Sequence, residues 1–173
     1  MRFGTKMMIA FIVMLALAYG IGGSVLINTS TGNSLNQSQT AAASSHRLIL
    51  YTLSTVSGVA QAGQRDREYS ELVDALTRLD AQGGHNWRSL RLSDSDGAIY
   101  VSRERNLYDN RLIDSVGSEN YAMMMFRSVG GDHILQIAGQ FEFGASEMYL
   151  ESIYDISPVF TGRQYQMAIA LID

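Results

Sequence analysis

The chain has 173 residues, a formal net charge of −4 and no cysteine. The missing cysteines exclude disulfide bonds, thiol catalysis and thiolate metal sites, and an acidic chain without a basic stripe is excluded as a nucleic-acid binder. Without its apolar N-terminal run, the chain retains about 145 residues, which is enough for one domain with its own core.

The first predicted element is an apolar helix at the N-terminus. From Met7 to Ile27 no residue is charged, and nearly every position is apolar, Gly or Ser. A helix needs about 20 such residues to cross the hydrocarbon of a bilayer. Arg2 and Lys6 precede the run, and cationic flanks of this kind stay in the cytoplasm. We therefore predict a cytoplasmic tip and transmembrane anchor over residues 1–27 of a cell-membrane protein, with the rest of the chain extracytoplasmic.

A cleaved signal peptide is the alternative for the same segment. The cationic start, the apolar stretch Met7–Leu15 and the triplet Ala16-Leu17-Ala18 fit that pattern. The apolar run nevertheless continues beyond Ala18 to Ile27, whereas a signal sequence usually becomes polar soon after its cleavage site. An uncleaved anchor is therefore favoured.

Helical patterns follow the anchor. Residues 28–45 are a polar juxtamembrane segment, whose Ser, Thr, Asn, Gln and Ala suit either a flexible linker or a helix. From Ala41 the apolar spacing predicts a helix that stops near Gly63 and a second helix that closes at Gly83-Gly84. The residues expected to face the core are Ile49, Leu53, Val56 and Ala60 in the first helix and Tyr69, Leu72, Val73, Leu76 and Leu79 in the second.

After Gly84 the pattern becomes that of β-strands. It predicts a hairpin of residues 87–92 and 98–102, a long polar connection over 103–117, and three further strands at 121–129, 133–143 and 147–155. Ser157 and Pro158 suit the N-cap and first position of an exit helix. The expected fold class is therefore α+β, with a five-stranded antiparallel sheet and helices on one of its faces.

The order of hairpin, connection and three-stranded meander resembles a PAS-like topology. The strongest likeness lies in Tyr149–Phe160, YLESIYDISPVF, where the last strand runs into a helix. Together with the anchor and the hairpin Leu90–Val101, these residues resemble the extracytoplasmic sensor region of bacterial membrane sensor histidine kinases, of the PAS-like or single Cache type. The resemblance implies a sensor domain over 46–157 and an exit helix, 158–173, directed toward a second span. Met167–Ile172 is too short for that span, so the span and a kinase core would lie beyond Asp173.

The resemblance implies the input module of a two-component sensor histidine kinase, which senses a small molecule or the state of the envelope and signals through its flanking helices. A parallel homodimer is expected, and Ala16, Gly20 and Ser24 recur every fourth residue, which allows close approach of helices in lipid. The alternative is a single-span, surface-anchored binding or adaptor module without signalling output. An enzyme comes third, because any kinase activity would belong to sequence outside this chain.

No residue pattern indicates catalysis, a metal or a cofactor. Asp94-Ser95-Asp96-Gly97 resembles half of a calcium loop, but Arg105 stands where an EF-hand needs Glu. His46, His85 and His133 have no metal-ligating neighbour at helical spacing, and no nucleophile-elbow motif supports a hydrolase triad. We therefore expect a hairpin turn at 94–97 and no catalytic, metal or cofactor site.

A ligand pocket in a domain of this type would lie between the sheet and the connection 103–117. The candidate ligand-binding residues, polar or amphipathic groups on otherwise apolar strands, are Tyr100, Tyr121, Arg127 and Gln136. Strand alternation places Arg127 on the same side as Met123 and Met125. A partly buried guanidinium there suits a carboxylate or phosphate, so an anionic ligand is expected at Arg127.

Overall fold

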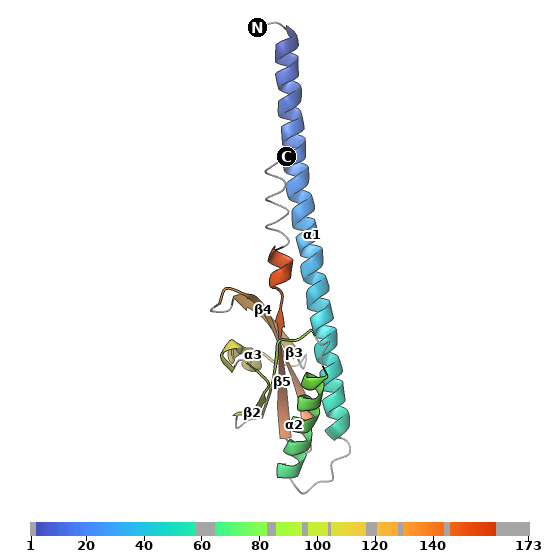
Figure 1. Ribbon diagram of the computed structural model, residues 1–173, viewed down its shortest axis with the longest axis vertical. Coiled ribbons are helices and arrows are strands. Elements are labelled where there is room, and N and C mark those ends of the chain that lie inside the picture. The colour runs from blue at the N-terminus through green and yellow to red at the C-terminus, as the bar shows by residue number, and fades with distance from the viewer. Residues whose placement is uncertain are drawn as a thin grey trace. The chain divides into compact units, whose positions relative to one another are not determined.

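The computed structural model describes residues 3–57, 65–82, 86–94, 97–103, 105–116, 121–127, 130–143 and 146–161. Two compact units divide the chain: residues 1–37 with 158–173, and residues 38–157. Residues 157–161 are helical. The elements are α1 (Phe3–Ser57), α2 (Arg65–Ala81), β1 (Ser89–Asp94), β2 (Gly97–Val101), η1 (Arg105–Leu107), α3 (Arg111–Asp114), β3 (Tyr121–Arg127), β4 (His133–Phe143) and β5 (Ser146–Asp155). Figure 1 labels all of them except β1 and η1.

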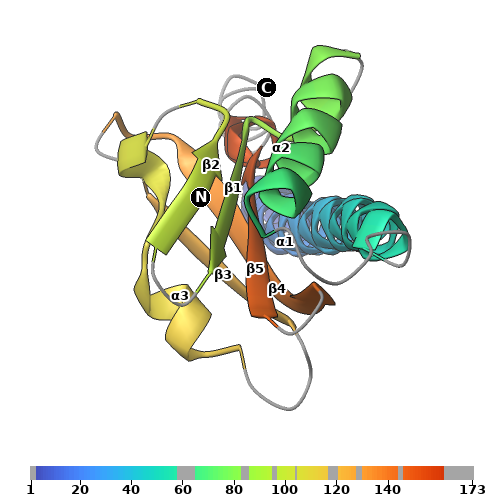
Figure 2. The same ribbon diagram turned by 90° about the horizontal axis from the view of Figure 1, so that it is seen from below.

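The unit 38–157 contains one five-stranded sheet of order β2-β1-β5-β4-β3, in which every pairing is antiparallel. The predicted α+β class and the five-stranded antiparallel sheet are therefore confirmed. Helix α2 and residues 38–57 of α1 cover one face, and α3 lies on the other (Figure 2). The first strand, β1, begins at Ser89, later than the predicted Trp87. The Trp87 indole N–H donates to Asp80 of α2 at 3.1 Å.

Helix α1 runs without a break through residues 28–45. Of the two alternatives for this segment, the structure shows a helix and not a flexible linker. Ala42 is buried, as is His46 one turn later, so this stretch already packs against the sheet. The compact unit accordingly begins at Ser38.

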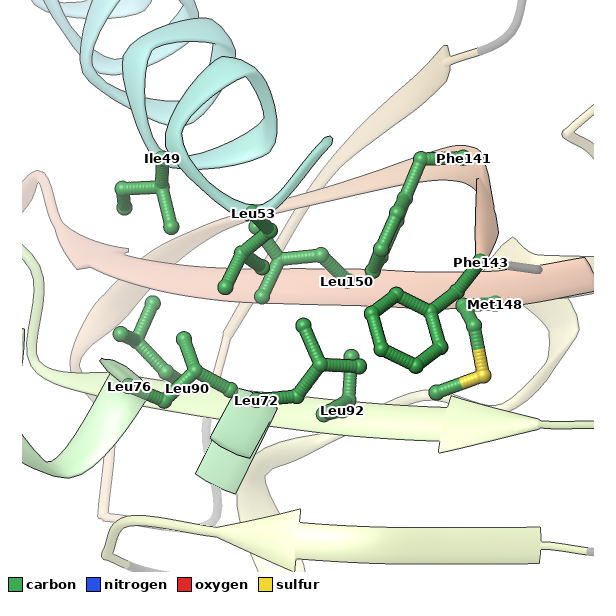
Figure 3. Close-up of a cluster of buried hydrophobic side chains, with 10 residues drawn as sticks. All are labelled: Ile49, Leu53, Leu72, Leu76, Leu90, Leu92, Phe141, Phe143, Met148 and Leu150. Atoms are coloured by element: carbon green, nitrogen blue, oxygen red, sulfur yellow. The ribbon is translucent and has the colours of Figure 1, made fainter. Parts of the chain in front are cut away.

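The core lies between the two helices and the sheet (Figure 3). Its ten buried side chains are Ile49 and Leu53 of α1, Leu72 and Leu76 of α2, Leu90 and Leu92 of β1, Phe141 and Phe143 of β4, and Met148 and Leu150 of β5. Each fully buried side chain of this size contributes about 1.5–3 kcal/mol through its removal from water. Four of the predicted inward positions, Ile49, Leu53, Leu72 and Leu76, are confirmed as members of the core, and Tyr69 and Leu79 are partly buried against it. Val73 is half-buried and does not belong to this cluster. The side chain of Val56 and the residues Ala60, Gly63, Gly83 and Gly84 lie outside the described part.

Among the described residues, no helix is both long and apolar enough to cross a membrane. The anchor expected at Met7–Ile27, which lies within α1, is thus not supported by the structure and stays a prediction.

Two local expectations can be compared with the structure. Asp94 closes the β1–β2 turn by accepting the Gly97 N–H at 3.0 Å, and Gly97 has a φ of 138°, a backbone conformation that suits glycine. These contacts are those of the expected hairpin turn.

Ser157, expected as the N-cap of the exit helix, is instead its first helical residue. Its hydroxyl accepts the His133 N–H at 2.9 Å, so it joins the helix start to β4.

Candidate functional site

The sheet face opposite α1 and α2 carries a buried group of charged and polar side chains. Arg91 of β1 and Glu151 of β5 are direct cross-strand partners, and Glu151 is fully buried. The Arg91 Nε donates to Glu151 Oε2, and the Arg91 Nη2 donates to Glu151 Oε1 at 2.8 Å. Gln136 of β4, also fully buried, donates its amide to the same Oε1 at 2.8 Å. The carboxylate is therefore held by three charge-assisted hydrogen bonds.

The same side chains fasten the connection between β2 and β3 to the sheet. The Gln136 side chain pairs with the Asp109 backbone: its Oε1 accepts the Asp109 N–H at 2.9 Å, and its Nε2 donates to the Asp109 carbonyl at 3.2 Å. The Arg91 Nη1 donates to Asn110 Oδ1 at 2.9 Å. The guanidinium also lies 4.5 Å from the centroid of the Tyr108 ring, a cation–π contact.

Tyr108 completes this attachment. Its hydroxyl donates to Ser89 Oγ of β1 at 2.6 Å. Burial raises the pKa of the Tyr108 phenol, so the hydroxyl stays a donor at physiological pH. The connection is thus joined to β1 and β4 through Ser89 and Gln136, which are both buried.

An open hollow of about 400 Å³ lies beside the attached connection. Its lining residues are Asn106, Leu107, Tyr108, Asp109, Asn110, Arg111 and Phe126. The apolar side chains of Leu107 and Phe126 line the hollow. An exposed ion pair also lines it, in which Arg111 donates to both carboxylate oxygens of Asp109. Hydrogen bonds from the Arg111 side chain and backbone lower the pKa of Asp109 to about 2. The hollow is therefore lined by a carboxylate, a guanidinium and side-chain amides, together with apolar side chains. This combination suits a small polar molecule.

On the opposite face of β5, the residue after Glu151 contacts α1. His46 Nδ1 and Ser152 Oγ lie 2.6 Å apart, and both side chains are buried. Burial, helped by the charge of Arg47, lowers the pKa of His46 to about 3, so the imidazole is neutral near pH 7. Two adjacent residues of β5 thus make contacts on opposite faces of the sheet. Glu151 binds Arg91 and Gln136 on one face, and Ser152 contacts α1 on the other.

The structure does not bring the four sequence-predicted ligand residues together. Tyr100 lies on β2 and Tyr121 on β3, which are opposite edges of the sheet. Tyr121 lies beneath the guanidinium of Arg47, which is 5.1 Å from its ring centroid. The backbone of Arg127 pairs with His133, and its side chain lies outside the described part. Gln136 alone belongs to the polar group described above, and binding of a ligand by any of the four stays a prediction.

Sequence reasoning missed Arg91, Glu151 and Tyr108. A signal was present, because Arg91 lies between Leu90 and Leu92, and Glu151 follows Leu150 in the middle of its strand. A charge at such a position needs a partner if its face is covered. What the sequence did not supply was the pairing of β1 with β5, which places the two charges opposite each other.

No family model and no curated protein matches the chain. Among solved structures, it is similar to the ligand-binding domain of the Pseudomonas aeruginosa PAO1 amino acid chemoreceptor PctC in complex with GABA, at 13% identity and a TM-score of 0.49, covering 80% of this chain and 63% of that one. A Mycobacterium tuberculosis transcriptional regulator (11% identity, TM-score 0.36, 80% and 66% covered) is also similar. So is the extracellular domain of vpHK1S-Z8, named as a histidine kinase (15% identity, TM-score 0.38, 76% and 59% covered). The chain spans less than two thirds of each, and likenesses below a TM-score of 0.5 assign neither family nor function.

Proposed function

We propose that the chain is the extracytoplasmic input module of a membrane receptor, a two-component sensor histidine kinase, and that it binds a small polar ligand in the hollow beside residues 106–111. The observation that carries this proposal is the hydrogen-bonded group beneath the connection, in which Arg91 pairs with the fully buried Glu151 and Gln136. A buried ion pair is costly to desolvate and is a weak device for stability alone. Its presence beneath an open hollow favours a role in positioning the connection.

A route from ligand to helix supports the same proposal. A ligand in the hollow would contact Asp109 and Asn110, whose positions depend on Gln136 and Arg91. Those side chains bond to Glu151, and the next residue of β5 contacts His46 of α1. The ligand would shift the helix only to the extent that it binds the two arrangements of the connection with different affinity.

The arrangement of the sheet supports a sensor of PAS-like or single Cache type. Hairpin, connection and meander follow in the order of the sequence resemblance, and the connection lies over the face opposite the long helices. The hollow is lined by residues of that connection and by Phe126 of β3.

A thermal-shift screen of small polar molecules, run on the full chain in detergent, tests the binding role. A ligand present at 100 times its dissociation constant stabilises the folded state by about 2.7 kcal/mol, which is measurable as a rise in Tm. We expect Arg111→Gln to abolish the rise for such a ligand, because Arg111 lines the hollow. Arg127→Met should leave it unchanged.

The two variants distinguish two sites. Loss of the shift in Arg127→Met alone would favour the anion site expected from the sequence over the hollow. Absence of any shift with any small molecule would favour the alternative function, a surface-anchored module that binds a protein or an envelope component.

We also propose that Met7–Ile27 anchors the module in the cell membrane with the domain outside. No described helix meets the length and hydropathy of a membrane span, and the proposal rests on the charges at Arg2 and Lys6 and on the exposure of apolar side chains. The five consecutive side chains of Phe11–Leu15 are 40% to 74% exposed, so apolar groups surround α1 on all sides. A helix that is apolar all round belongs in a core or a membrane.

Protease added to intact cells tests this orientation. We expect the domain to be digested while the N-terminus remains Met1, because the uncleaved run holds the domain outside. A domain shielded from the protease would show that the orientation is wrong. A mature N-terminus near Tyr19 would show that the run is a cleaved signal peptide.

A further inference from the structure

Two methionine side chains are exposed on the edge strand β3. Met123 is 37% exposed and Met125 is 44% exposed, whereas Met148 of β5 is fully buried. Successive residues of a strand point to opposite faces, so Met123 and Met125 share one face and Met124 lies on the other. Because the chain has no cysteine, its thioethers are the sulfur groups open to oxidation, and these two are the exposed ones among the described methionines of the unit 38–157.

The same face of β3 contacts α1. The Gln39 amide donates to the Met125 sulfur at 3.4 Å. Two turns further along α1, the Arg47 guanidinium lies 5.1 Å from the centroid of the Tyr121 ring. The helix rises about 12 Å between its two contact residues, and the strand covers about 13 Å between its own, so α1 and β3 run side by side over this distance. Met125 is therefore both open to solvent and in contact with the helix.

Oxidation of Met125 would change this contact through the hydrogen-bond acceptor. A thioether sulfur is a weak acceptor. Transfer of one oxygen atom to the sulfur gives a sulfoxide, which is polar, and this conversion is reversible by methionine sulfoxide reductases. The Gln39 amide already donates to the sulfur, so a sulfoxide oxygen at the same place gives that amide a stronger acceptor.

We propose that Met123 and Met125 form an oxidation site for a small oxygen-donating oxidant, and that the sulfoxide at Met125 holds α1 more firmly than the thioether does. Each sulfur gives two electrons to the oxidant and gains one oxygen atom. With hypochlorous acid, the oxygen–chlorine bond breaks, and chloride and a proton leave. With hydrogen peroxide, the oxygen–oxygen bond breaks, and water leaves. The oxidation follows from exposure alone, whereas a signal carried onward by α1 rests on the proposed function.

Limited oxidation of the full chain in detergent, followed by mass spectrometry, tests the site. Hypochlorous acid and hydrogen peroxide are used in separate samples, and the one that reacts at the lower concentration identifies the oxidant. We expect sulfoxide to form at Met123 and Met125 roughly tenfold faster than at Met148, because burial excludes the oxidant. Trypsin cleaves after Arg127 and so places the exposed pair and Met148 on different peptides.

A sample unfolded in urea is the control for selectivity, since all three methionines should then react at similar rates. Equal rates at Met123, Met125 and Met148 in the folded chain would overturn the oxidation site.

Hydrogen exchange measures the effect on α1. After oxidation we expect the backbone amides around Gln39 to exchange about two- to tenfold more slowly, the effect of one added hydrogen bond of ordinary net strength. Treatment with methionine sulfoxide reductase should restore the original rates. The response should persist in Met123→Leu and vanish in Met125→Leu, which removes the sulfur that Gln39 contacts. Met8 and Met14 are also exposed, but both variants retain them, so they cannot cause a difference between the two.

Unchanged or faster exchange in the oxidised chain would refute the link to α1, as would an equal response in the two variants. The outcome is separable from that of the proposed function. A chain that is oxidised selectively at the exposed pair but shows no ligand in the thermal-shift screen would refute small-molecule binding and leave the oxidation site standing.

Discussion

Replacing Arg91 by Met is expected to lower the free energy of unfolding by about 3–5 kcal/mol, because the variant leaves the Glu151 carboxylate buried without its cation. The side chain of Glu151 is fully buried, and that of Arg91 is 11% exposed, so water cannot replace the lost partner. The expected loss also includes the attachment of Asn110, which accepts from the same guanidinium. Urea unfolding of the full chain in detergent, followed by the fluorescence of the single tryptophan, Trp87, measures the change.

Two controls separate this effect from a general loss of charge. Arg111→Met breaks the ion pair with Asp109 at the surface, where the Arg111 side chain is 84% exposed, and should leave stability almost unchanged. The double variant Arg91→Met/Glu151→Leu should recover most of the loss, because it leaves no unpaired charge. Equal destabilisation by Arg91→Met and Arg111→Met would show that the buried pair does not hold the connection as we describe.

Gly139→Ala is expected to destabilise the domain by about 1–3 kcal/mol, the usual cost of overpacking a filled core. A methyl group at Gly139 would lie 2.5 Å from Leu50 Cδ1 and 2.6 Å from His46 Nε2. The leucine can turn away, but the imidazole is held by Ser152. The helix must therefore move away from β4, and the core around Ile49 and Leu53 opens with it.

The matched control is Gly32→Ala, on a part of α1 where nothing lies within 4 Å of the added methyl. That variant should be neutral or stabilising by up to about 1 kcal/mol, because alanine favours the helix over glycine. Removing the imidazole with Gly139→Ala/His46→Ala should cost less than the sum of the two single changes, as expected for residues in contact. Additive losses would mean that the close approach at Gly139 does not constrain α1.

Local patterns in the sequence were enough to find most of the elements. Alternating apolar residues located β4 at His133–Phe143 and β5 to within one residue of its start. The helical spacing of Ile49, Leu53, Leu72 and Leu76 identified the side chains that now fill the core. These predictions succeeded because one buried face imposes a period of two on a strand and about 3.6 on a helix.

The candidate site required the tertiary structure. Glu151 and Arg91 are 60 positions apart, and nothing in either strand specifies that β1 pairs with β5 and not with β3. The connection was predicted only as a polar segment, but the structure shows Asp109 hydrogen-bonded through its backbone to the Gln136 side chain. Tyr100, Tyr121 and Arg127 were grouped with Gln136 by residue type, although Tyr100 lies on the edge strand β2 and the other two lie on the opposite edge strand β3.

The sequence by itself therefore determined most of the helices, strands and turns, and it contains the apolar run of Met7–Ile27, because these properties depend on neighbours a few positions apart. The tertiary structure decided which strands adjoin, how the connection meets the sheet, and where α1 approaches Gly139. Those features depend on contacts between residues far apart in the chain. Burial makes such contacts decisive, since Glu151 and His46 can be out of water only where Arg91, Gln136 and Ser152 meet them.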